Sequence, residues 1–456
     1  MPVTSRQFLT GRLIVILEND SGFVNLIYRD RNMFLTDEEK RILDGEKGEI
    51  AQRCMQFLVA YGEAAGAERL VDLDGTVDMH PGPSWVPEYD VKPQEVAELA
   101  RKGERFKVPT FSDKATAPSF VMDGWEHCGV LPSSDPEFHR KCLENLKPYM
   151  DMGMVPTFSC DHYLVSTYWP SVGQHCAWVE SSAIPWVNAI LGARSNFDGC
   201  FQTAYLGKVP AYDMHITENR AATVLVSCEA ELKTDMDYDL FGWVVGEMLG
   251  LKVPAFVGIG RPTTTQLVKM NSALNTAGQV RMYHIPGLTP EAPTLEAAFQ
   301  GKKPAETVSI TRQDLRRVYE MMNYGSSDDV DFVYLGCPHY NIEEIRKVAD
   351  LIEGKKCKVR LWVMTNHPTY KIADLAGYRE KIEEAGGLLL SGTCPGLLMG
   401  KVMPPSDYPD VVAMDATKQD YYITGHCHPH KVQVRYGTTE DCVNAAITGK
   451  WQGEWR

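Results

Sequence analysis

The chain has 456 residues, of which 44% are hydrophobic and 23% are charged, so it has the composition of a globular protein with room for two or three domains. Its formal net charge of -14 argues against binding to nucleic acid or to an anionic membrane, although a few local arginines can still hold an anionic substrate. No segment has the roughly 18 uninterrupted apolar residues of a membrane-spanning helix, so we expect a cytoplasmic protein whose 12 cysteines are mostly reduced.

The first part of the chain, residues 1–35, has the pattern of an extension of the main fold. Short apolar runs on either side of Glu18–Gly22 predict a hairpin in it. Thr36 is then the predicted N-cap of a helix, because Glu39 stands three residues later and completes a capping box. A longer helix is expected from residue 48 to about residue 65, where apolar residues recur on one face.

The middle of the chain mixes short apolar runs with glycines and prolines, and its elements are hard to separate. Residues 289–307 contain three prolines and a charged cluster, a composition that is typical of a connection. We therefore predict a domain boundary near residue 300, with an α/β region over residues 36–300 and a second α/β domain over residues 301–456.

The last third of the chain alternates strand-like and helix-like patterns. Such alternation predicts βαβ units and a parallel sheet, so the fold class is α/β. The predicted strands cover residues 331–335, 359–364, 387–390, 411–414 and 432–436, and the predicted helices cover 342–352, about 371–385 and 439–447.

Two cysteines follow predicted strands of this sheet. Cys337 comes directly after the first strand, and Cys394 comes directly after the third, each in a short turn of glycine and proline. Ligands of open parallel sheets gather beyond the carboxyl ends of the strands, so both thiols are expected at one edge. The alternative is that both are ordinary buried cysteines.

A third cysteine, Cys160, lies in Pro156–Leu164 and opens a series of motifs. These motifs resemble the aconitase X family, and the resemblance covers about residues 34–450. It implies an aconitase-like, multi-domain α/β fold that ends in the parallel-sheet domain. The other motifs that carry the resemblance are Ala177–Ala183, Leu191–Asn196, His215–Arg220, Tyr283–Ala292 and Gly336–His339.

The resemblance implies an iron–sulfur cluster held by Cys160, Cys337 and Cys394. The cluster type stays open between 4Fe–4S, 3Fe–4S and 2Fe–2S. The family commonly has two cysteines in the first motif, but here Phe158 stands at the first position. The usual Thr-Pro after the second cysteine is replaced by Asp161 and a histidine. Both changes lie beside the expected cluster and bear on substrate choice or cluster type.

Three protein thiolates leave one iron position for a substrate oxygen, which suits the removal of a hydroxyl group. Arg194 and Asn196 are the predicted binders of a substrate carboxylate, and Ser181 and Ser182 are predicted to donate hydrogen bonds to it. The serines could instead cap a helix that begins near Ala183, and Arg194 could be an ion-pair partner of Glu180.

A further set of residues is predicted to bind the substrate or to brace the site. His80 is added to the catalytic candidates, because the family often has a histidine near this position. The run His426–His430 could bind a metal by itself, but we expect a loop there. The remaining predicted residues are His215, Glu218, Asn219, Arg220 and His339.

Aconitase-like enzymes use a small swivelling domain that supplies a catalytic serine from a turn rich in glycine and serine, and no such turn stands out in this chain. We therefore expect a small partner subunit that carries this serine, so that the protein is a heteromer. The predicted function is that of a hydro-lyase large subunit acting on a small carboxylate substrate. Family activities include dehydration of cis-3-hydroxy-L-proline and of phosphomevalonate, and a compact hydroxy acid or hydroxyproline-like compound is favoured over phosphomevalonate.

Two other functions remain open. An aconitase-type isomerase would rehydrate the intermediate at another carbon. A non-catalytic iron–sulfur regulatory protein would keep the cluster without turnover, but the three thiols together with Arg194 favour chemistry, and the charge of -14 disfavours RNA binding.

Overall fold

The computed structural model of the chain describes residues 33–81, 90–113, 122–129, 135–166, 168–394, 396, 398–399 and 403–455. Helices and mainly parallel strands alternate through this part of the chain, which confirms the predicted α/β class. The hairpin predicted around Glu18–Gly22 lies outside the described residues and stays a prediction. Among the described residues, no helix is both long enough and apolar enough to cross a membrane.

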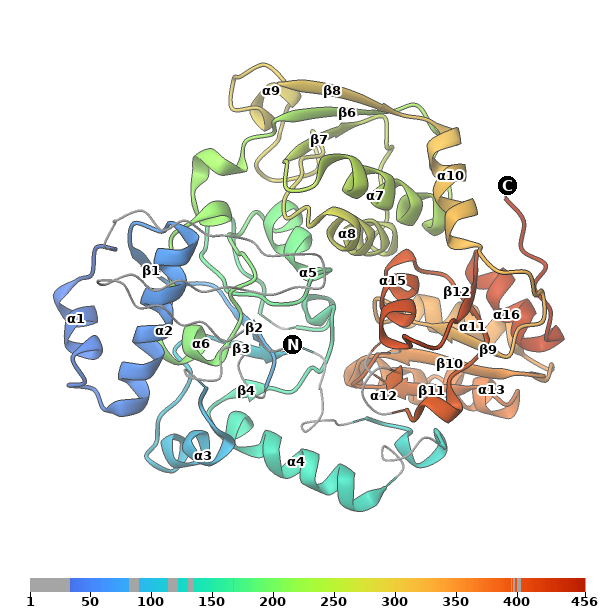
Figure 1. Cartoon of the computed structure of the whole chain (residues 1–456), viewed down its shortest axis with the longest axis horizontal. Coiled ribbons are helices and arrows are strands. Elements are labelled where there is room, and N and C mark those ends of the chain that lie inside the picture. The colour runs from blue at the N-terminus through green and yellow to red at the C-terminus, as the bar shows by residue number, and fades with distance from the viewer. Residues whose placement is uncertain are drawn as a thin grey trace.

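The first unit, drawn in blue to green in Figure 1, contains the parallel sheet β2-β3-β4 and the antiparallel pair β1-β5. Its first helix begins as predicted, because the Thr36 hydroxyl accepts from the Glu39 amide and the Glu39 carboxylate accepts from the Thr36 amide. The unit comprises α1 (Asp37–Leu43), α2 (Glu49–Ala65), β1 (Leu70–Asp72), β2 (Val77–Met79), α3 (Pro93–Arg101), β3 (Thr110–Ser112), α4 (Pro136–Asp151), β4 (Met154–Val155), α5 (Ala183–Pro185), α6 (Phe201–Leu206) and β5 (Lys208–Pro210).

The second unit is a parallel sheet in the order β7-β6-β8 with two long helices. These helices, α7 and α8, pack closely at Gly242, where a Cβ atom would lie 2.5 Å from the backbone oxygen of Met270. The unit comprises β6 (Val224–Cys228), α7 (Asp235–Leu249), β7 (Pro254–Val257), α8 (Thr264–Gly278), α9 (Leu295–Ala298), β8 (Glu306–Ile310) and α10 (Arg312–Met322).

The strand β8 bears on the domain boundary predicted near residue 300. It lies beyond that position and pairs with β6 along its whole length, from Glu306 opposite Val224 to Ile310 opposite Cys228. A division at residue 300 would therefore cut this sheet, because the proline-rich segment is the connection that leads into β8. We propose that the boundary lies after α10 instead.

The third unit is a five-stranded parallel sheet in the order β11-β10-β9-β12-β13. All five predicted strands are present, and each begins and ends within two residues of its predicted bounds. The helix predicted over residues 371–385 is divided at Gly377, whose positive φ of 77° ends one helix and begins the next. The unit comprises β9 (Phe332–Leu335), α11 (Ile342–Ile352), β10 (Arg360–Thr365), α12 (His367–Leu375), α13 (Tyr378–Glu384), β11 (Leu388–Ser391), β12 (Val411–Met414), α15 (Thr417–His426), β13 (Gln433–Tyr436) and α16 (Thr439–Thr448).

The helix α8 joins the three units. It contacts α5 of the first unit and α15 of the third, and it lies between them in Figure 1. A single apolar core accordingly runs from Trp178 in the first unit through Phe241 in the second to Tyr334 in the third. This shared core holds the carboxyl edge of the large sheet against the loops of the first unit.

Candidate active site

The carboxyl edge of the five-stranded sheet carries two of the three predicted cysteines. Cys337 follows β9 and Cys394 follows β11, and only β10 stands between these strands. Gly336 makes the first of these turns feasible, because its φ is 98° and a Cβ atom there would lie 2.2 Å from the backbone oxygen of Met364. The prediction that both thiols leave the same edge of one sheet is therefore confirmed.

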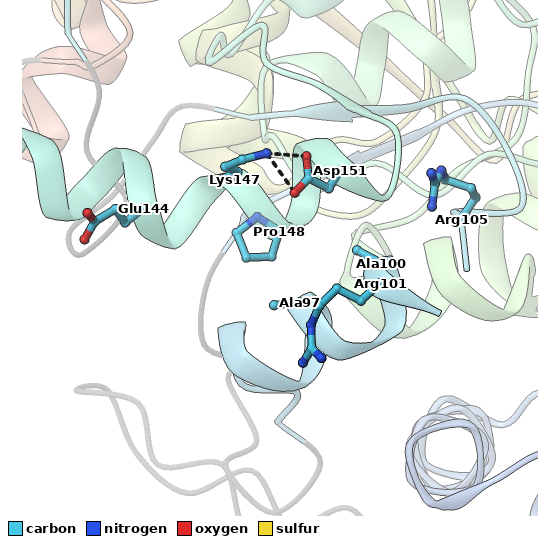
Figure 2. A pocket seen from close by; sticks show the side chains of 8 residues that line it. All are labelled: Ala97, Ala100, Arg101, Arg105, Glu144, Lys147, Pro148 and Asp151. Carbon is cyan, nitrogen blue, oxygen red and sulfur yellow. Dashed lines mark hydrogen bonds and ion pairs between the residues drawn. The ribbon is translucent and has the colours of Figure 1, made fainter. Parts of the chain in front are cut away.

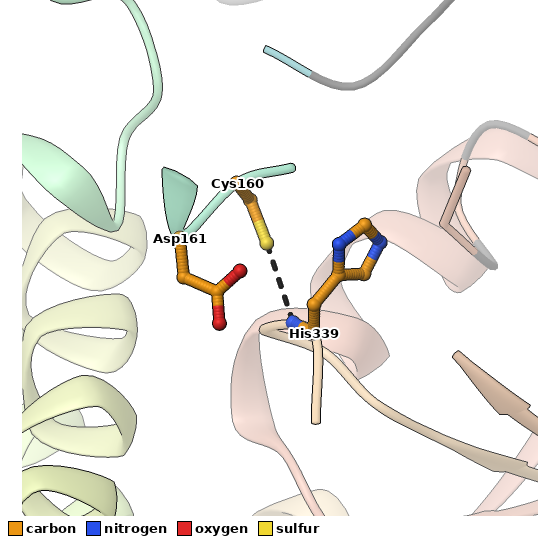
Figure 3. Close-up of side chains that lie close together, drawn as sticks. All are labelled: Cys160, Asp161 and His339. Carbon is orange, nitrogen blue, oxygen red and sulfur yellow. Dashed lines mark hydrogen bonds between the residues drawn. The ribbon is translucent and has the colours of Figure 1, made fainter. Parts of the chain in front are cut away.

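His339 connects the three segments that carry the cysteines. Its backbone amide donates to the Sγ atom of Cys160 at 3.3 Å, as Figure 3 shows. Its Nε2 atom donates to the backbone oxygen of Thr393 at 2.6 Å, next to Cys394. Since His339 itself follows Cys337 by two residues, one buried residue links all three loops through its backbone amide and its ring. The residues brought together come from far apart in the sequence.

Asp161 and Ser159 complete the surroundings of Cys160. The Ser159 hydroxyl bonds with the Asp161 carboxyl group and lies 3.2 Å from Nδ1 of His339. Burial raises the pKa of Asp161 to about 7, so this acid keeps a proton far more easily than an exposed aspartate does. Three potential metal-binding atoms lie within 4.8 Å of one another here, one each from Cys160, Asp161 and His339. Both ring nitrogens of His339 already have hydrogen-bond partners, however, and this favours a bracing role over ligation.

The thiol of Cys337 is buried beside a cation. Burial raises the pKa of Cys337 to about 12, while the ammonium group of Lys418 acts in the opposite direction. Cys160 is also buried, and Cys394 is partly exposed. Protonated buried thiols become thiolates when a soft metal binds, so these positions suit iron–sulfur ligation and are poor sites for thiol chemistry without a metal.

Lys418 is a site residue that the sequence reasoning missed. It lies in the first turn of α15, next to the carboxyl end of β12, and only 4% of it is exposed. Its Nζ atom lies 2.5 Å from the Glu180 carboxylate and 2.7 Å from the Ser181 hydroxyl. The signal that could have found it is its position after a strand of the same sheet whose edge carries the cysteines.

Ser181 and Ser182 lie at this edge as well. The Ser182 hydroxyl donates to the backbone oxygen of Cys160 at 3.3 Å. Ser182 occupies the N-cap position of α5, but its side chain makes no capping hydrogen bond, so the structure does not favour the helix-cap alternative. Glu180, the alternative partner of Arg194, is instead ion-paired with Lys418.

Arg194 and Asn196 lie in a neighbouring network. The Arg194 guanidinium donates to the backbone oxygen of His215 at 2.9 Å and to the Thr217 hydroxyl at 2.8 Å. The side-chain amide of Asn196 is occupied by two backbone groups, the oxygen of Tyr212 and the amide of Met214. Asn196 therefore holds a loop in place, whereas the guanidinium of Arg194 is only half-buried.

The predicted site residues His215 and Arg220 each have polar partners nearby. His215 lies 3.2 Å from the Asp198 carboxylate and 2.9 Å from the ring of His175, and burial lowers the pKa of His175 to about 4. Arg220 is fully buried and pairs with Glu291. The exposed candidates are Glu218 and Asn219.

His80 lies in a group of buried acids. Its Nδ1 atom is 3.2 Å from the carboxylate of Asp113, and the nearby Asp78 lies 3.6 Å from the ring of His162. Burial raises the pKa of Asp78 well above its usual value, and the charges of Asp113 and Glu180 add to that effect. Burial lowers the pKa of His162 to about 3, so this ring stays neutral. Asp78 and Asp113 were not predicted as site residues, because neither belongs to a recognisable spacing.

Two other features lie apart from this edge. A groove of about 480 Å³ between α3 and α4 is lined by charged side chains such as Lys147 and Asp151, which pair with each other (Figure 2). Its described lining includes no predicted site residue.

In the run His426–His430, Cys427 is buried and His430 donates to the backbone oxygen of Pro409 at 3.0 Å.

Comparison with known proteins identifies the family. Three family models match the chain in sequence order: the aconitase X first domain over residues 32–218, the second domain over residues 222–320 and the third domain over residues 330–448. The chain belongs to the aconitase X family. The predicted resemblance is thus confirmed, and the second family domain includes β8 and α10.

The relatives with known activities are dehydratases, which are hydro-lyases. The phosphomevalonate dehydratase large subunit of Methanothermobacter thermautotrophicus is 33% identical over 408 residues, which are 89% of this chain and 96% of that protein. The cis-3-hydroxy-L-proline dehydratase of Hypocrea jecorina is 30% identical over 440 residues, which are 91% of this chain and 69% of that protein. The predicted assignment to the hydro-lyases is confirmed.

A solved structure supports the same assignment. The crystal structure of Thermococcus kodakaraensis aconitase X in its holo-form superposes with a TM-score of 0.74 and 31% sequence identity. The likeness covers 91% of this chain and 100% of that one. The aconitase-like α/β fold predicted from the sequence is therefore confirmed.

Proposed function

We propose that the chain is the large, iron–sulfur-carrying subunit of a dehydratase that removes water from a 3-hydroxy carboxylic acid. The convergence of the three cysteine-bearing segments on His339 carries this proposal. The substrate class is supported by the two activities of the relatives, because phosphomevalonate and cis-3-hydroxy-L-proline both have a hydroxyl group on the second carbon from the carboxyl carbon. Loss of water from either compound forms a double bond next to the carboxylate.

Cys160, Cys337 and Cys394 would hold the cluster. The donor set fits, because three thiols are the soft ligands that iron–sulfur clusters take. Two buried oxygens beside them, Asp161 Oδ2 and Thr393 Oγ1, have no hydrogen-bond partner in the described part of the chain, as expected beside a group that accepts such contacts. When bound, a cluster with three protein ligands supplies a Lewis-acidic iron for a substrate oxygen. Its type stays open between 4Fe–4S, 3Fe–4S and 2Fe–2S.

The substrate carboxylate is held by cations and hydroxyl groups of this chain. Lys418 and Ser181 already lie 2.7 Å apart at the sheet edge and together offer a charge and a donor. Arg194 of the first unit keeps part of its guanidinium accessible to solvent. It is the second candidate for binding the substrate anion. His80, Asn196, His215, Glu218, Asn219 and Arg220 stay predicted site residues, most of which orient the surrounding loops.

The base that removes the proton next to the carboxylate is proposed to come from a serine of a small partner subunit. The name "large subunit" of several relatives supports such a partner. The reduced thiols that the site requires suit the cytoplasm, which is where we place the protein.

The proposal is tested with the chain co-expressed with its small partner and purified without oxygen. We expect iron and sulfide in the complex and dehydration of phosphomevalonate or of cis-3-hydroxy-L-proline. Cys160→Ala, Cys337→Ala and Cys394→Ala should each lose most of the iron, while the buried Cys54→Ala on α2 should keep it. Unchanged iron content in all three site variants would remove the basis of the proposal.

The same preparation separates the two alternative functions. An aconitase-type isomerase would yield a product with its hydroxyl group on another carbon, which product analysis in deuterated water reveals. A regulatory protein would contain the cluster without turning over either compound. The dehydratase names of the relatives favour simple water removal.

A further inference from the structure

His367 lies at the same sheet edge as the cysteines, and the function proposed above does not use it. It is the first residue of α12 and comes two residues after the end of β10. The strand order β11-β10-β9 places β10 between the strand that precedes Cys394 and the strand that precedes Cys337. His367 therefore follows a strand that lies between the two strands leading to the Cys337 and Cys394 loops.

Asp123 determines which ring nitrogen carries a proton. Its Oδ2 atom lies 2.5 Å from Nδ1 of His367 and 2.6 Å from the hydroxyl of Ser391. Burial acts to raise the pKa of Asp123, but the hydrogen bonds from His367 and Ser391 outweigh it and hold the pKa well below its usual range. The ionised carboxylate can only accept, so Nδ1 of His367 carries a proton in this pair, whether or not Nε2 carries a second one.

The other nitrogen of the ring points away from Asp123. The Nε2 atom is buried and has no hydrogen-bond partner in the described part of the chain. The ring packs edge-to-face against Phe158 with centroids 5.4 Å apart, and Phe158 precedes Cys160 by two residues. The ring therefore contacts the loop that carries Cys160, and a carboxylate holds it in the way that orients catalytic histidines.

The pair could instead be only a clamp. The backbone groups of Asp123 also bond to Ser391, through the Asp123 amide at 3.1 Å and the Asp123 oxygen at 3.2 Å, which fastens the segment 122–129 to β11. A clamp, however, uses only the Nδ1 side of His367. A clamp does not explain why Nε2 is buried without a hydrogen-bond partner in the described part of the chain, whereas a proton donor to the substrate does.

We propose that His367 donates the proton that leaves with the substrate hydroxyl group. This inference rests on the dehydratase function proposed above. In the reaction His367 starts as an imidazolium ion, with one proton on Nδ1 toward Asp123 and a second on Nε2. The C–O bond breaks, its electron pair stays on oxygen, and the Nε2 proton completes the departing water, which leaves a neutral ring with its proton on Nδ1. The base takes the proton from the carbon next to the carboxylate, and that C–H electron pair forms the double bond. One proton enters the protein and one leaves it in each turnover, so no further reactant is needed.

The charges around the ring come from three elements. Asp123 lies in the segment before α4, Lys371 on α12 places its Nζ atom 3.3 Å from the other oxygen of Asp123, and His139 of α4 is within electrostatic reach. Burial lowers the pKa of His139, so it contributes little charge near neutral pH. The carboxylate is thus the charge that dominates at the imidazole.

The test uses a variant that keeps the clamp and removes the donor. An asparagine amide can occupy the position of Nδ1 but has nothing in place of Nε2, so His367→Asn retains the bond to Asp123. In the complex with its small partner we expect kcat to fall about 100-fold or more with a small change in KM. The alkaline decrease of kcat that marks loss of the imidazole proton should also disappear. The control Lys371→Met, which removes an exposed cation from the same carboxylate, should keep kcat within twofold of the unmodified complex.

A substrate analogue distinguishes proton donation from positioning. When fluorine replaces the substrate hydroxyl group, fluoride leaves without needing a full proton, so His367→Asn should eliminate fluoride nearly as fast as the unmodified complex. An equal loss on both substrates, or an unchanged kcat on the hydroxy acid, would overturn the assignment of His367 while leaving the dehydratase function intact. If the unmodified complex dehydrates neither phosphomevalonate nor cis-3-hydroxy-L-proline, the proposed function fails, and the role of His367 falls with it.

Discussion

The buried ammonium group of Lys418 is paired with the carboxylate of Glu180, and both side chains are almost completely inaccessible to water. Removing one member of such a pair leaves an uncompensated buried charge, which costs about 3 to 5 kcal/mol. Lys418→Met should therefore lower the free energy of unfolding by this amount and abolish turnover. Urea denaturation and dehydration assays check the two effects.

A double variant separates folding from function at the same position. Lys418→Met combined with Glu180→Gln removes both charges of the pair, so most of the lost stability should return while activity stays absent. Recovery of activity in the double variant would contradict the proposed role of Lys418 in carboxylate binding. The partners are 238 residues apart in sequence, so no local pattern could have revealed them.

The cysteines, in contrast, could be predicted. Cys337 and Cys394 each follow a strand with a clear apolar pattern, and the parallel order of the sheet brings their loops to one edge. The first cysteine, Cys160, lies in irregular structure and was found only through the family resemblance. His367 was missed because its partners, Asp123 and Ser391, come from segments whose contact depends on the tertiary fold.

At the scale of elements, the turn from β9 into the Cys337 loop depends on Gly336. Alanine there would be strained by the positive φ, and its Cβ atom would collide with the backbone oxygen of Met364. Gly336→Ala should lower the free energy of unfolding by more than about 2 kcal/mol and reduce the iron content. Gly354→Ala is the matched control, because its φ is also positive but a Cβ atom there meets open space; it should cost about 1 kcal/mol. Equal losses in the two variants would contradict the argument.

The junction of α7, α15 and β13 predicts a pH effect. Asp239 on α7 accepts from the backbone amide and hydroxyl of Thr417 and from the hydroxyl of Tyr436, and burial raises its pKa from 3.8 to about 6. Between these values the folded state holds a proton that the unfolded state releases. The stability that this proton contributes is present below pH 4 and is lost as the pH rises through about 6, by up to about 3 kcal/mol.

Asp239→Asn tests this sign. Asparagine does not titrate, so the decrease of stability between pH 4 and pH 6 should be smaller in the variant than in the unmodified chain. Asp374→Asn on α12, an exposed position, should keep the original pH dependence. A variant of Asp239 with an unchanged slope would show that another group is responsible.

The same elements show where sequence patterns suffice. The capping box of α1 and the strands of the third unit were predicted correctly, because both depend on residues close together in the chain. The boundary near residue 300 stays a prediction, and the pairing of β8 with β6 is the observation that bears on it. Proline content marks a connection but cannot reveal that β8, beyond it, pairs with β6, which lies about 80 residues earlier.

At the scale of the whole molecule, the names of the relatives support a partner subunit. The chain spans 96% and 98% of two phosphomevalonate dehydratase large subunits, but only 69% and 70% of two cis-3-hydroxy-L-proline dehydratases. The longer proteins therefore have additional chain that this one does not match. The relatives that this chain spans almost fully are named large subunits, a name that implies a smaller partner.

The large chain alone should therefore contain its cluster but turn over no substrate. Adding the separately purified small subunit should restore activity, and the rate should saturate at one copy per large chain, because one site needs one serine. Iron content measured before and after addition is the control, since it should not change if the partner contributes only the base. Replacing the partner's catalytic serine with alanine should leave binding intact and abolish the restored turnover. Full activity of the isolated large chain would contradict the requirement for a partner, and the base would then have to come from the buried acids around Asp78.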